Sequence, residues 1–266
     1  MKQPLGKTAL ITGASSGIGL ELAKLFAKDG WQLVLAARGK KELQAAAQEL
    51  EKNYGASTLI IAKDLSNASA PQQIFDELKK KKITVDALVN NAGFATYGKF
   101  SKVPLQKQLD MLQVNVNSLV ALTSLFLPQM LERKSGRILN LASTAAFQPG
   151  PLMAAYYASK AFVLSFSQAL AEELEGSGVT VTALCPGPTW TNFQKTAGML
   201  NSKILGGNVM SAQKVAQAGF AGAMDGKRVV IPGFQNKLGA KIVKLIPAKL
   251  LTHLIRKIQE ERQGKE

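Results

Sequence analysis

The sequence has very little thiol or imidazole chemistry. Cys185 is its one cysteine and His253 its one histidine among 266 residues. A single cysteine cannot form a disulfide within the chain, and one residue of each kind is a thin supply for the four ligands of a structural zinc ion. These scarcities exclude a disulfide-stapled scaffold and disfavour a metal site, so we expect no bound metal and a surface role for His253.

Long apolar runs and a leader-like start are also missing. No run approaches the roughly 18 apolar residues of a membrane-spanning helix. The first residues, Met1–Lys7, lack the apolar core of a signal peptide, and a strand-like run begins at Thr8. With 46% hydrophobic and 19% charged residues, the composition is that of a folded globular protein. We therefore expect a cytoplasmic protein, with any membrane association confined to its surface.

Acidic residues are scarce relative to basic ones. The chain carries 33 Lys+Arg against 18 Asp+Glu, a formal net charge of +15. Such an excess is compatible with nucleic acid, an anionic membrane or a phosphorylated ligand as partner. Binding of nucleic acid would rest on charge alone, and the sequence does not favour it.

Short apolar runs alternate with longer amphipathic runs along most of the chain. The apolar runs suit strands buried on both faces of a parallel sheet, and they are Thr8–Thr12, Gln32–Ala36, Thr58–Ala62, Ala87–Asn90, Arg137–Ala142, Thr180–Cys185 and Val229–Ile231. Helical periodicity marks the segments Ile18–Lys28, Lys40–Asn53, Pro71–Lys81, Leu105–Phe126, Tyr156–Leu174 and Ala212–Ala223. The alternation predicts an α/β protein with a Rossmann-like, doubly wound parallel sheet of seven strands and helices on both faces. We assign it to one domain, residues 1–232, followed by a basic amphipathic helical tail, residues 233–266.

A glycine-rich turn follows the first expected strand. It reads Thr12-Gly13-Ala14-Ser15-Ser16-Gly17-Ile18-Gly19 and leads into an amphipathic helix. In a dinucleotide-binding fold the first glycine permits the tight turn, the second lets the backbone approach a pyrophosphate, and the third lets helix and strand pack closely. An ordinary glycine turn is the alternative. The position of the turn favours cofactor binding, with Ser15, Ser16 and Ile18 as further contacts.

Arg38 follows the second expected strand. Many NAD-binding folds place an acidic residue here, which accepts hydrogen bonds from the adenine ribose. A guanidinium cannot accept them, but it can pair with a 2′-phosphate and stack on adenine. The sequence therefore predicts NADP(H) in preference to NAD(H), the alternative being a solvated arginine in a loop.

Tyr156 and Lys160 lie four residues apart in an expected helix, so their side chains project from one face. A nearby ammonium stabilises phenolate, which brings tyrosine closer to acid–base work at neutral pH. Ser143 ends the fifth expected strand, and ligands of doubly wound sheets bind outside the carboxyl ends of the strands. These three residues are the candidate catalytic group.

Six blocks follow one another in a fixed order along the chain. They are the T-G-x-x-x-G-x-G turn at 12–19, Asn90-Asn91-Ala92-Gly93, Val114-Asn115-Val116, Asn140-Leu141-Ala142-Ser143, Tyr156 with Lys160, and Pro186-Gly187-Pro188-Thr189-Trp190-Thr191. Together they resemble the short-chain dehydrogenase/reductase family. The thirteen-residue separation of Ser143 and Tyr156 also matches the family. The resemblance spans Thr8 to about Val230.

The resemblance implies a role for each catalytic residue. Tyr156 would give a proton to a carbonyl or take one from an alcohol, and Ser143 would stabilise the developing oxyanion. Lys160 would lower the pKa of Tyr156 and hold the nicotinamide ribose. Asn115 would keep a water in a proton relay.

The resemblance also implies cofactor contacts beyond the glycine turn and Arg38. Asp64, with Leu65 beside it, would contact adenine, unless Asp64 is only a helix cap. Thr189 and Thr191 would hold the nicotinamide carboxamide. The remaining expected cofactor contacts are Asn91, Ala92, Gly93, Pro186, Gly187 and the catalytic Tyr156 and Lys160.

A mostly apolar substrate pocket is expected near these blocks. Its candidate lining, besides Ser143, is Phe94, Phe147, Met153, Trp190 and Phe193, with Tyr97 nearby. Such a lining suits a lipophilic ketone, aldehyde or acyl thioester, although plain packing explains aromatics equally well. Residues 192–210 lack strong periodicity and would form a lid.

The tail continues past the point where compact members of this family end. Lys237–Ile246 and Ala248–Gln259 read as two amphipathic helices separated by Pro247. Three interpretations stay open: packing on the core or on a second subunit, an interfacial helix on anionic lipid, or nucleic-acid binding.

The sequence thus predicts an NADP(H)-dependent oxidoreductase that interconverts a carbonyl and an alcohol, with Tyr156 as general acid/base. A 3-oxoacyl thioester reductase and a hydroxysteroid dehydrogenase would use the same residues. A regulator that binds NADP without turnover belongs to a different class, and the intact catalytic residues argue against it. We expect a small-molecule substrate and a homo-oligomer.

Overall fold

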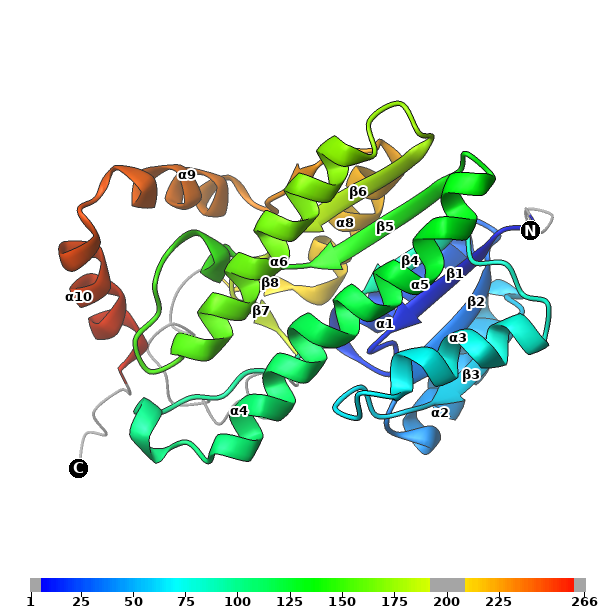
Figure 1. Cartoon of the computed structure of the whole chain (residues 1–266), viewed down its shortest axis with the longest axis horizontal. Helices are drawn as coiled ribbons and strands as arrows, with labels where there is room; N and C mark the ends of the chain where they lie inside the picture. The colour runs from blue at the N-terminus through cyan, green and yellow to red at the C-terminus, as the bar shows by residue number, and fades with distance from the viewer. Residues whose placement is uncertain (1–5, 192–208, 261–266) are drawn as a thin grey trace.

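The computed structural model describes residues 6–191 and 209–260, and it confirms the expected doubly wound architecture (Figure 1). Seven parallel strands form one sheet in the order β3-β2-β1-β4-β5-β6-β9. Their bounds are β1 Thr8–Thr12, β2 Gln32–Ala37, β3 Thr58–Ala62, β4 Ala87–Asn90, β5 Gly136–Leu141, β6 Val179–Leu184 and β9 Val229–Val230. The order reverses between β1 and β4, which is the point where ligands bind in folds of this kind.

Helices cover both faces of the sheet. One face carries α1 (Gly17–Lys28), α2 (Lys40–Tyr54) and α8 (Ala212–Met224), and the other carries α3 (Ala70–Lys80), α5 (Ser118–Glu132) and α6 (Ala154–Glu173). Strand residues alternate between these layers: Leu33 and Leu35 of β2 pack with α1, whereas Val34 packs on the α3 side. Both faces of each central strand are therefore buried, as a parallel sheet requires.

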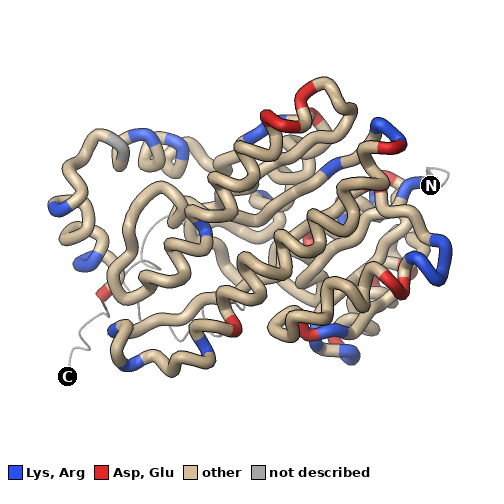
Figure 2. Tube along the Cα trace, in the orientation of Figure 1, with Lys and Arg blue, Asp and Glu red and all other residues tan. Residues whose placement is uncertain are grey.

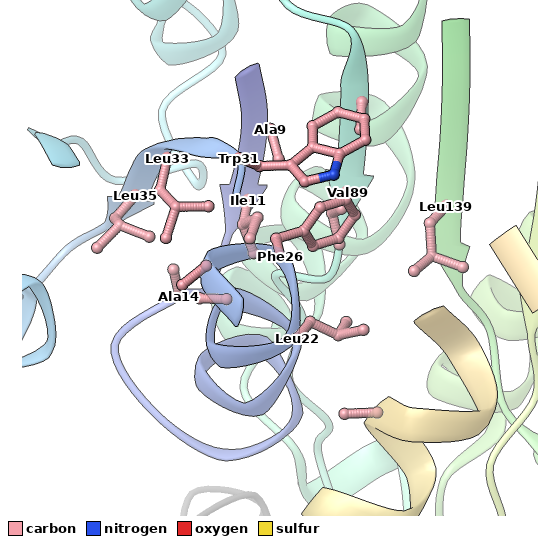
Figure 3. Packing of buried hydrophobic residues seen from close by; sticks show 14 of the residues in the cluster. Ala9, Ile11, Ala14, Leu22, Phe26, Trp31, Leu33, Leu35, Val89 and Leu139 are labelled. Carbon is pink, nitrogen blue, oxygen red and sulfur yellow. The ribbon is translucent and has the colours of Figure 1, made fainter. Parts of the chain in front are cut away.

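The aromatic centre of the α1 layer lies between α1 and β1 (Figure 3). The rings of Phe26 and Trp31 meet edge to face with their centroids 5.2 Å apart. Ile11 and Val89 lie beneath them on adjacent strands, and Leu22 extends the cluster along α1. This packing fixes the second half of α1, the helix into which the glycine-rich turn leads, against the sheet.

One long helical segment differs from its sequence expectation. Leu105–Glu132 runs through α4 (Leu105–Leu112), a π-helical turn (Gln113–Asn117) and α5. Among the described residues it is the one helix that is long and apolar enough to cross a membrane, with a mean hydropathy of 1.3. Met111, Phe126 and Met130 on it are buried in the core, whereas Leu105, Leu109 and Leu131 are exposed.

Two short strands were not predicted from the sequence. β7 (Thr189–Trp190) pairs in parallel with β8 (Met210–Ser211) outside the main sheet. Each has two residues, too few for an alternating pattern to be visible. Residues 192–208, which include most of the expected lid, lie outside the described part of the chain.

The tail forms two helices at one end of the molecule, α9 (Phe234–Ile242) and α10 (Ala248–Gln259), joined by a 3₁₀ turn (Val243–Leu245) (Figure 1). The bounds of α10 are those expected from the sequence. Leu251 and Ile255 of α10 are buried in a cluster with Met153 and Tyr157. Core packing, one of the three interpretations of the tail, therefore holds for this row of α10.

Candidate active site

A cleft of about 780 Å³ opens where the strands end. Segments that follow β1, β2, β3, β4, β5 and β6 all contribute to its wall. The predicted residues in the wall are Gly13, Ser15, Ser16, Gly17, Ile18, Arg38, Asp64, Leu65, Asn91, Ala92, Gly93, Phe94, Ser143, Met153, Tyr156, Lys160, Pro186, Gly187, Thr189 and Thr191. Residues spread over most of the chain thus converge on one cavity.

The glycine-rich turn is shaped for close approach. Gly13 and Gly17 have φ of +66° and +56°, values that side-chain-bearing residues rarely adopt. A Cβ on Gly19 would lie 2.3 Å from the carbonyl oxygen of Gly13, so only glycine fits there. Ser16 caps α1 without a side-chain hydrogen bond to its first amides. The cradle therefore fits a phosphate group at a helix N-terminus.

Thr12 and Asn91 brace this turn from the neighbouring strands. The amide of Asn91 donates to the carbonyl oxygens of Thr12 (2.8 Å) and Gly13 (3.2 Å). The hydroxyl of Thr12 accepts from the main-chain amides of Asn91 and Ala92, each at 3.0 Å. The sequence reading missed the part played by Thr12, although its place at the end of β1 could have drawn attention to it.

Arg38 and Asp64 meet at the rim of the cleft. A guanidinium nitrogen of Arg38 lies 3.9 Å from a carboxylate oxygen of Asp64, and their side chains are 67% and 45% exposed. Such an exposed pair contributes little to stability. Asp64 also accepts from the amide and hydroxyl of Ser66, each at 2.9 Å, so it shapes its own turn. The start of α3 has Ser69, not Asp64, at its N-cap position.

Ser143 is held by main-chain groups at the end of β5. Its hydroxyl accepts from the amide of Ala145 at 3.1 Å and donates to the carbonyl oxygen of Pro186 at 3.3 Å. It also hydrogen-bonds to Tyr156. The structure therefore brings together the serine and tyrosine that the sequence had paired.

Tyr156 is a buried phenol in the first turn of α6. Burial raises its pKa well above the ordinary value, while the hydrogen bond with Ser143 lowers it in part and Tyr157 raises it. The lowering expected from Lys160 is not among the main influences in the protein by itself. Burial therefore favours the protonated phenol of Tyr156.

Lys160 is buried one helical turn from Tyr156. Its Nζ lies 5.8 Å from the centroid of the Tyr156 ring and donates to the carbonyl oxygen of Leu141 at 2.7 Å. Burial lowers the pKa of Lys160 to about 8, against a smaller raising effect of Cys185. Its ammonium is anchored at the end of β5, facing the cleft that Tyr156 also lines.

Asn115 does not line the cleft but holds part of its wall. It is buried in the π-helical turn, and such turns often occur at functional sites. Its side chain donates to the carbonyl oxygen of Phe94 at 3.0 Å and accepts from the amide of Phe94 at 3.1 Å. A third bond of 3.2 Å reaches Ser159 on α6. Asn115 thus ties the segment after β4 to the helix that carries Tyr156 and Lys160.

The expected substrate residues divide into two groups. Phe94 and Met153 lie in the cleft wall, whereas Phe147 and Trp190 do not. Phe147 packs on a separate apolar cluster around Val163, and Trp190 is 59% exposed on β7. Phe193 lies outside the described residues. Sequence position near a catalytic block does not fix the direction of a side chain, which explains the difference.

The sequence did not predict a polar group in the wall of the cleft. The side-chain amide of Gln259 in α10 donates to the hydroxyl of Tyr157, which also interacts with Gln148. Burial raises the pKa of Tyr157 to about 12. Tyr157 and Gln148 both line the cleft. No local signal in the sequence links residues this far apart.

Comparison with known proteins identifies the family to which the chain belongs. The family model described as short chain dehydrogenase matches residues 7–201. The chain belongs to the short-chain dehydrogenase/reductase family. This family consists of oxidoreductases, and its blocks occupy the cleft described above.

Individual relatives agree in sequence and in structure. A very-long-chain 3-oxoacyl-CoA reductase of Anas platyrhynchos is 38% identical over 197 residues, which cover 72% of this chain and 62% of that protein. A short-chain dehydrogenase of Sphingobium yanoikuyae, solved with NADPH, superposes with a TM-score of 0.82 at 31% identity and covers 97% of this chain and 99% of its own. A bulky-bulky ketone specific alcohol dehydrogenase of Comamonas testosteroni gives a TM-score of 0.76 at 30% identity, covering 90% and 93%. The chain spans about three fifths of the length of the first sequence relatives it matches.

Proposed function

We propose that the protein is an NADP(H)-dependent oxidoreductase that interconverts a ketone or aldehyde and the corresponding alcohol. The observation that carries this proposal is the meeting of Tyr156, Ser143 and Lys160 in the cleft that the glycine-rich turn opens into. The family membership and the NADPH bound by the Sphingobium relative support it.

In the proposed reaction a bound reduced nicotinamide supplies the hydride that the carbonyl carbon receives. Tyr156 gives its phenolic proton to the carbonyl oxygen, so the two transfers together produce a neutral alcohol. Ser143 donates a hydrogen bond to the same oxygen as negative charge develops on it. Alcohol oxidation runs through the same groups in reverse.

Lys160 and Asn115 have supporting roles in this proposal. The ammonium of Lys160 would hold the ribose hydroxyls of the cofactor and, with the charge of an oxidised nicotinamide, would oppose the pKa increase that burial gives Tyr156. Asn115 fixes Phe94 opposite α6 and keeps a water in the path that returns a proton to Tyr156.

Cofactor recognition is divided along the cleft. The amides at the start of α1, with Ser15, Ser16 and Ile18, would hold the pyrophosphate. Arg38 would pair with the 2′-phosphate, and Asp64 with Leu65 would contact adenine. Asn91, Ala92, Gly93, Pro186 and Gly187 would line the path between, with Thr189 and Thr191 at the carboxamide. Preference for NADP(H) over NAD(H) rests on Arg38.

The substrate side combines apolar and polar groups. Phe94 and Met153 favour a lipophilic carbonyl compound, and Tyr157 with Gln148 offers hydrogen bonds at the same wall. The names of the relatives support two subclasses, a 3-oxoacyl thioester and a bulky ketone. A steroid is a third candidate for the same catalytic residues.

The test is a screen of NADPH oxidation over aliphatic aldehydes, aromatic ketones, steroids and β-keto thioesters. We expect at least one class to be reduced by the protein and not by its Tyr156→Phe variant. Tight NADPH binding without turnover of any class would instead support a cofactor-sensing regulator. We also propose that residues 1–232 form the catalytic domain and residues 233–266 a tail. A cytoplasmic location and a homo-oligomeric state are further proposals.

A further inference from the structure

Helix α10 presents two exposed rows that its packing on the core does not use. Leu250, Leu254 and Ile258 recur every four residues, which places them in one row along the helix. Their side chains are 61%, 46% and 40% exposed. The adjacent row is Lys249, His253 and Lys257, which is exposed as well. The helix therefore shows solvent an apolar row beside a basic one.

Helix α9 repeats this arrangement. Phe234, Leu238 and Ile242 again recur every four residues, with 79%, 46% and 44% exposure. Lys237 and Lys241 form the exposed row on the same side of the apolar row as in α10. Two helices separated by Pro247 thus carry the same pattern in the same rotational order.

The charge of this segment has one sign. Residues 226–259 contain no Asp or Glu. The cations from α9 to the end of α10 are Lys237, Lys241, Lys244, Lys249, Arg256 and Lys257. Figure 2 shows basic positions along both helices, with an acidic one only where α10 ends. This acidic residue is Glu260, and its carboxylate lies 3.7 Å from the guanidinium of Arg256.

A third row holds α10 in place. Leu251, Ile255 and Gln259 are 4%, 7% and 0% exposed, and they pack on the cluster that contains Met153 and Tyr157. The fold therefore does not need the apolar rows of α9 and α10 for its own core. Exposed aliphatic and aromatic side chains in ordered rows mark an interaction surface.

We propose that α9 and α10 form a docking surface for a membrane rich in anionic lipid headgroups. An interfacial helix binds such a surface by sinking apolar side chains at the level of the headgroups while lysines and arginines meet the negative charge. The two rows supply six apolar side chains for insertion. The lysines and arginines, with no carboxylate between residues 226 and 259, supply the attraction to anionic headgroups. A second copy of the chain is a poorer partner for this surface, because the basic rows of the two copies would repel each other. Nucleic acid is also a poorer partner, because it would leave the rows of apolar side chains exposed.

Docking in this way would bring the substrate cleft close to the lipid. The inner row of α10 contacts Tyr157, which lines the cleft, so one helix has lipid on one side and the cleft wall on the other. This consequence rests on the proposed function, because it concerns delivery of a lipophilic carbonyl compound. The docking itself stands independently of catalysis.

Co-sedimentation of the full chain with vesicles tests the proposal. We expect binding to vesicles of mixed phosphatidylglycerol and phosphatidylcholine, little binding to phosphatidylcholine alone, and weakening as salt rises from about 0.05 to about 0.5 M. Triple variants L250S/L254S/I258S and K237Q/K241Q/K249Q should each lower the partition coefficient about tenfold or more. All of these substitutions are at exposed positions, so Tm should stay within a few degrees of the wild type.

Matched variants far from the tail complete the design. K79Q/K80Q/K81Q removes three charges at the end of α3, which lies at the other end of the molecule from α10 (Figure 1), and should leave binding nearly unchanged. L131S, at a site exposed to 38%, is the control for the loss of an exposed leucine outside the tail. No binding to anionic vesicles, or equal losses in tail and control variants, would overturn the proposal. Self-association without vesicles that L250S/L254S/I258S abolishes, or capture of an acidic protein in place of vesicles, would overturn it too. An inactive protein that still binds vesicles would refute the proposed function and leave the docking surface intact.

Discussion

The hydroxyl of Tyr97 donates a 2.6 Å hydrogen bond to the main-chain carbonyl of Gln259, across 162 residues of sequence. Gln259 in turn donates its side-chain amide to Tyr157 in the cleft wall. The end of α10 is therefore fastened both to the segment after β4 and to helix α6. Through these contacts the tail supports the wall of the cleft.

Neighbouring leucines in α10 should differ sharply in their contribution to stability. Leu251 is 4% exposed and Leu250 is 61% exposed. Leu251→Ala should lower the free energy of unfolding by about 2–4 kcal/mol, because it leaves a cavity beside Tyr157. Leu250→Ala should change it by less than about 0.5 kcal/mol. Urea unfolding followed by circular dichroism measures both, and equal effects would contradict the packing of α10 on the core.

Removal of the Tyr156 hydroxyl should separate chemistry from binding. Tyr156→Phe should abolish carbonyl reduction, because the phenol that contacts Ser143 is the proposed proton donor, while the Kd for NADPH changes little. Ser143→Ala should lower kcat by roughly 10²–10³, the cost of one oxyanion donor. Steady-state rates and cofactor fluorescence give the two quantities. A Tyr156→Phe protein that still reduces the substrate would refute the role of Tyr156.

Arg38 should control the choice between the two nicotinamide cofactors. Loss of a charge-assisted contact to the 2′-phosphate should raise the KM for NADPH by about tenfold or more in Arg38→Ala. The KM for NADH should stay nearly constant, because NADH lacks that phosphate. Lys63→Ala, a second cation in the cleft wall, is the matched control. Equal kcat/KM for NADPH and NADH in the wild type would argue against the assignment.

A methyl group at Gly19 should damage the cofactor site, whereas one at Gly239 should not. In Gly19→Ala the new Cβ meets the Gly13 carbonyl oxygen at 2.3 Å, so the turn must shift and NADPH binding should be lost. Gly239 in α9 has nothing within 4 Å of such a Cβ. Gly239→Ala should stabilise the helix by up to about 1 kcal/mol. Isothermal titration with NADPH and thermal unfolding of both variants provide the comparison.

The burial of Lys160 should appear in the pH dependence of stability. Its pKa is about 8 in the folded protein against 10.5 as the ordinary value. Between these two pH values the unfolded chain binds more protons at this residue than the folded one, so its contribution to the free energy of unfolding rises with pH. Lys160→Met removes this contribution. The unfolding free energy of the wild type minus that of Lys160→Met should therefore rise from pH 8 to pH 10. A difference that does not change with pH would contradict the burial of Lys160.

Patterns in the sequence were enough to predict the sheet, its helices and the composition of most of the cleft. Parallel strands buried on both faces give continuous apolar runs, and the segments after their carboxyl ends must meet at one edge, so Gly13, Ser143 and Tyr156 could be brought together without coordinates. The bounds of α10 could also be predicted, because Pro247 precedes the helix and the apolar period continues to Ile258, next to its last residue.

The environment of each side of α10, in contrast, depends on how the helix packs against distant parts of the chain. Leu250 and Leu251 are the same residue type in adjacent rows, and nothing local says which row packs on Tyr157 and which faces solvent. For the same reason, the sequence could not show that Trp190 is exposed and that Phe147 packs on another cluster. Periodicity fixes which side chains share a face, but only the shape of the distant surface fixes which face it meets.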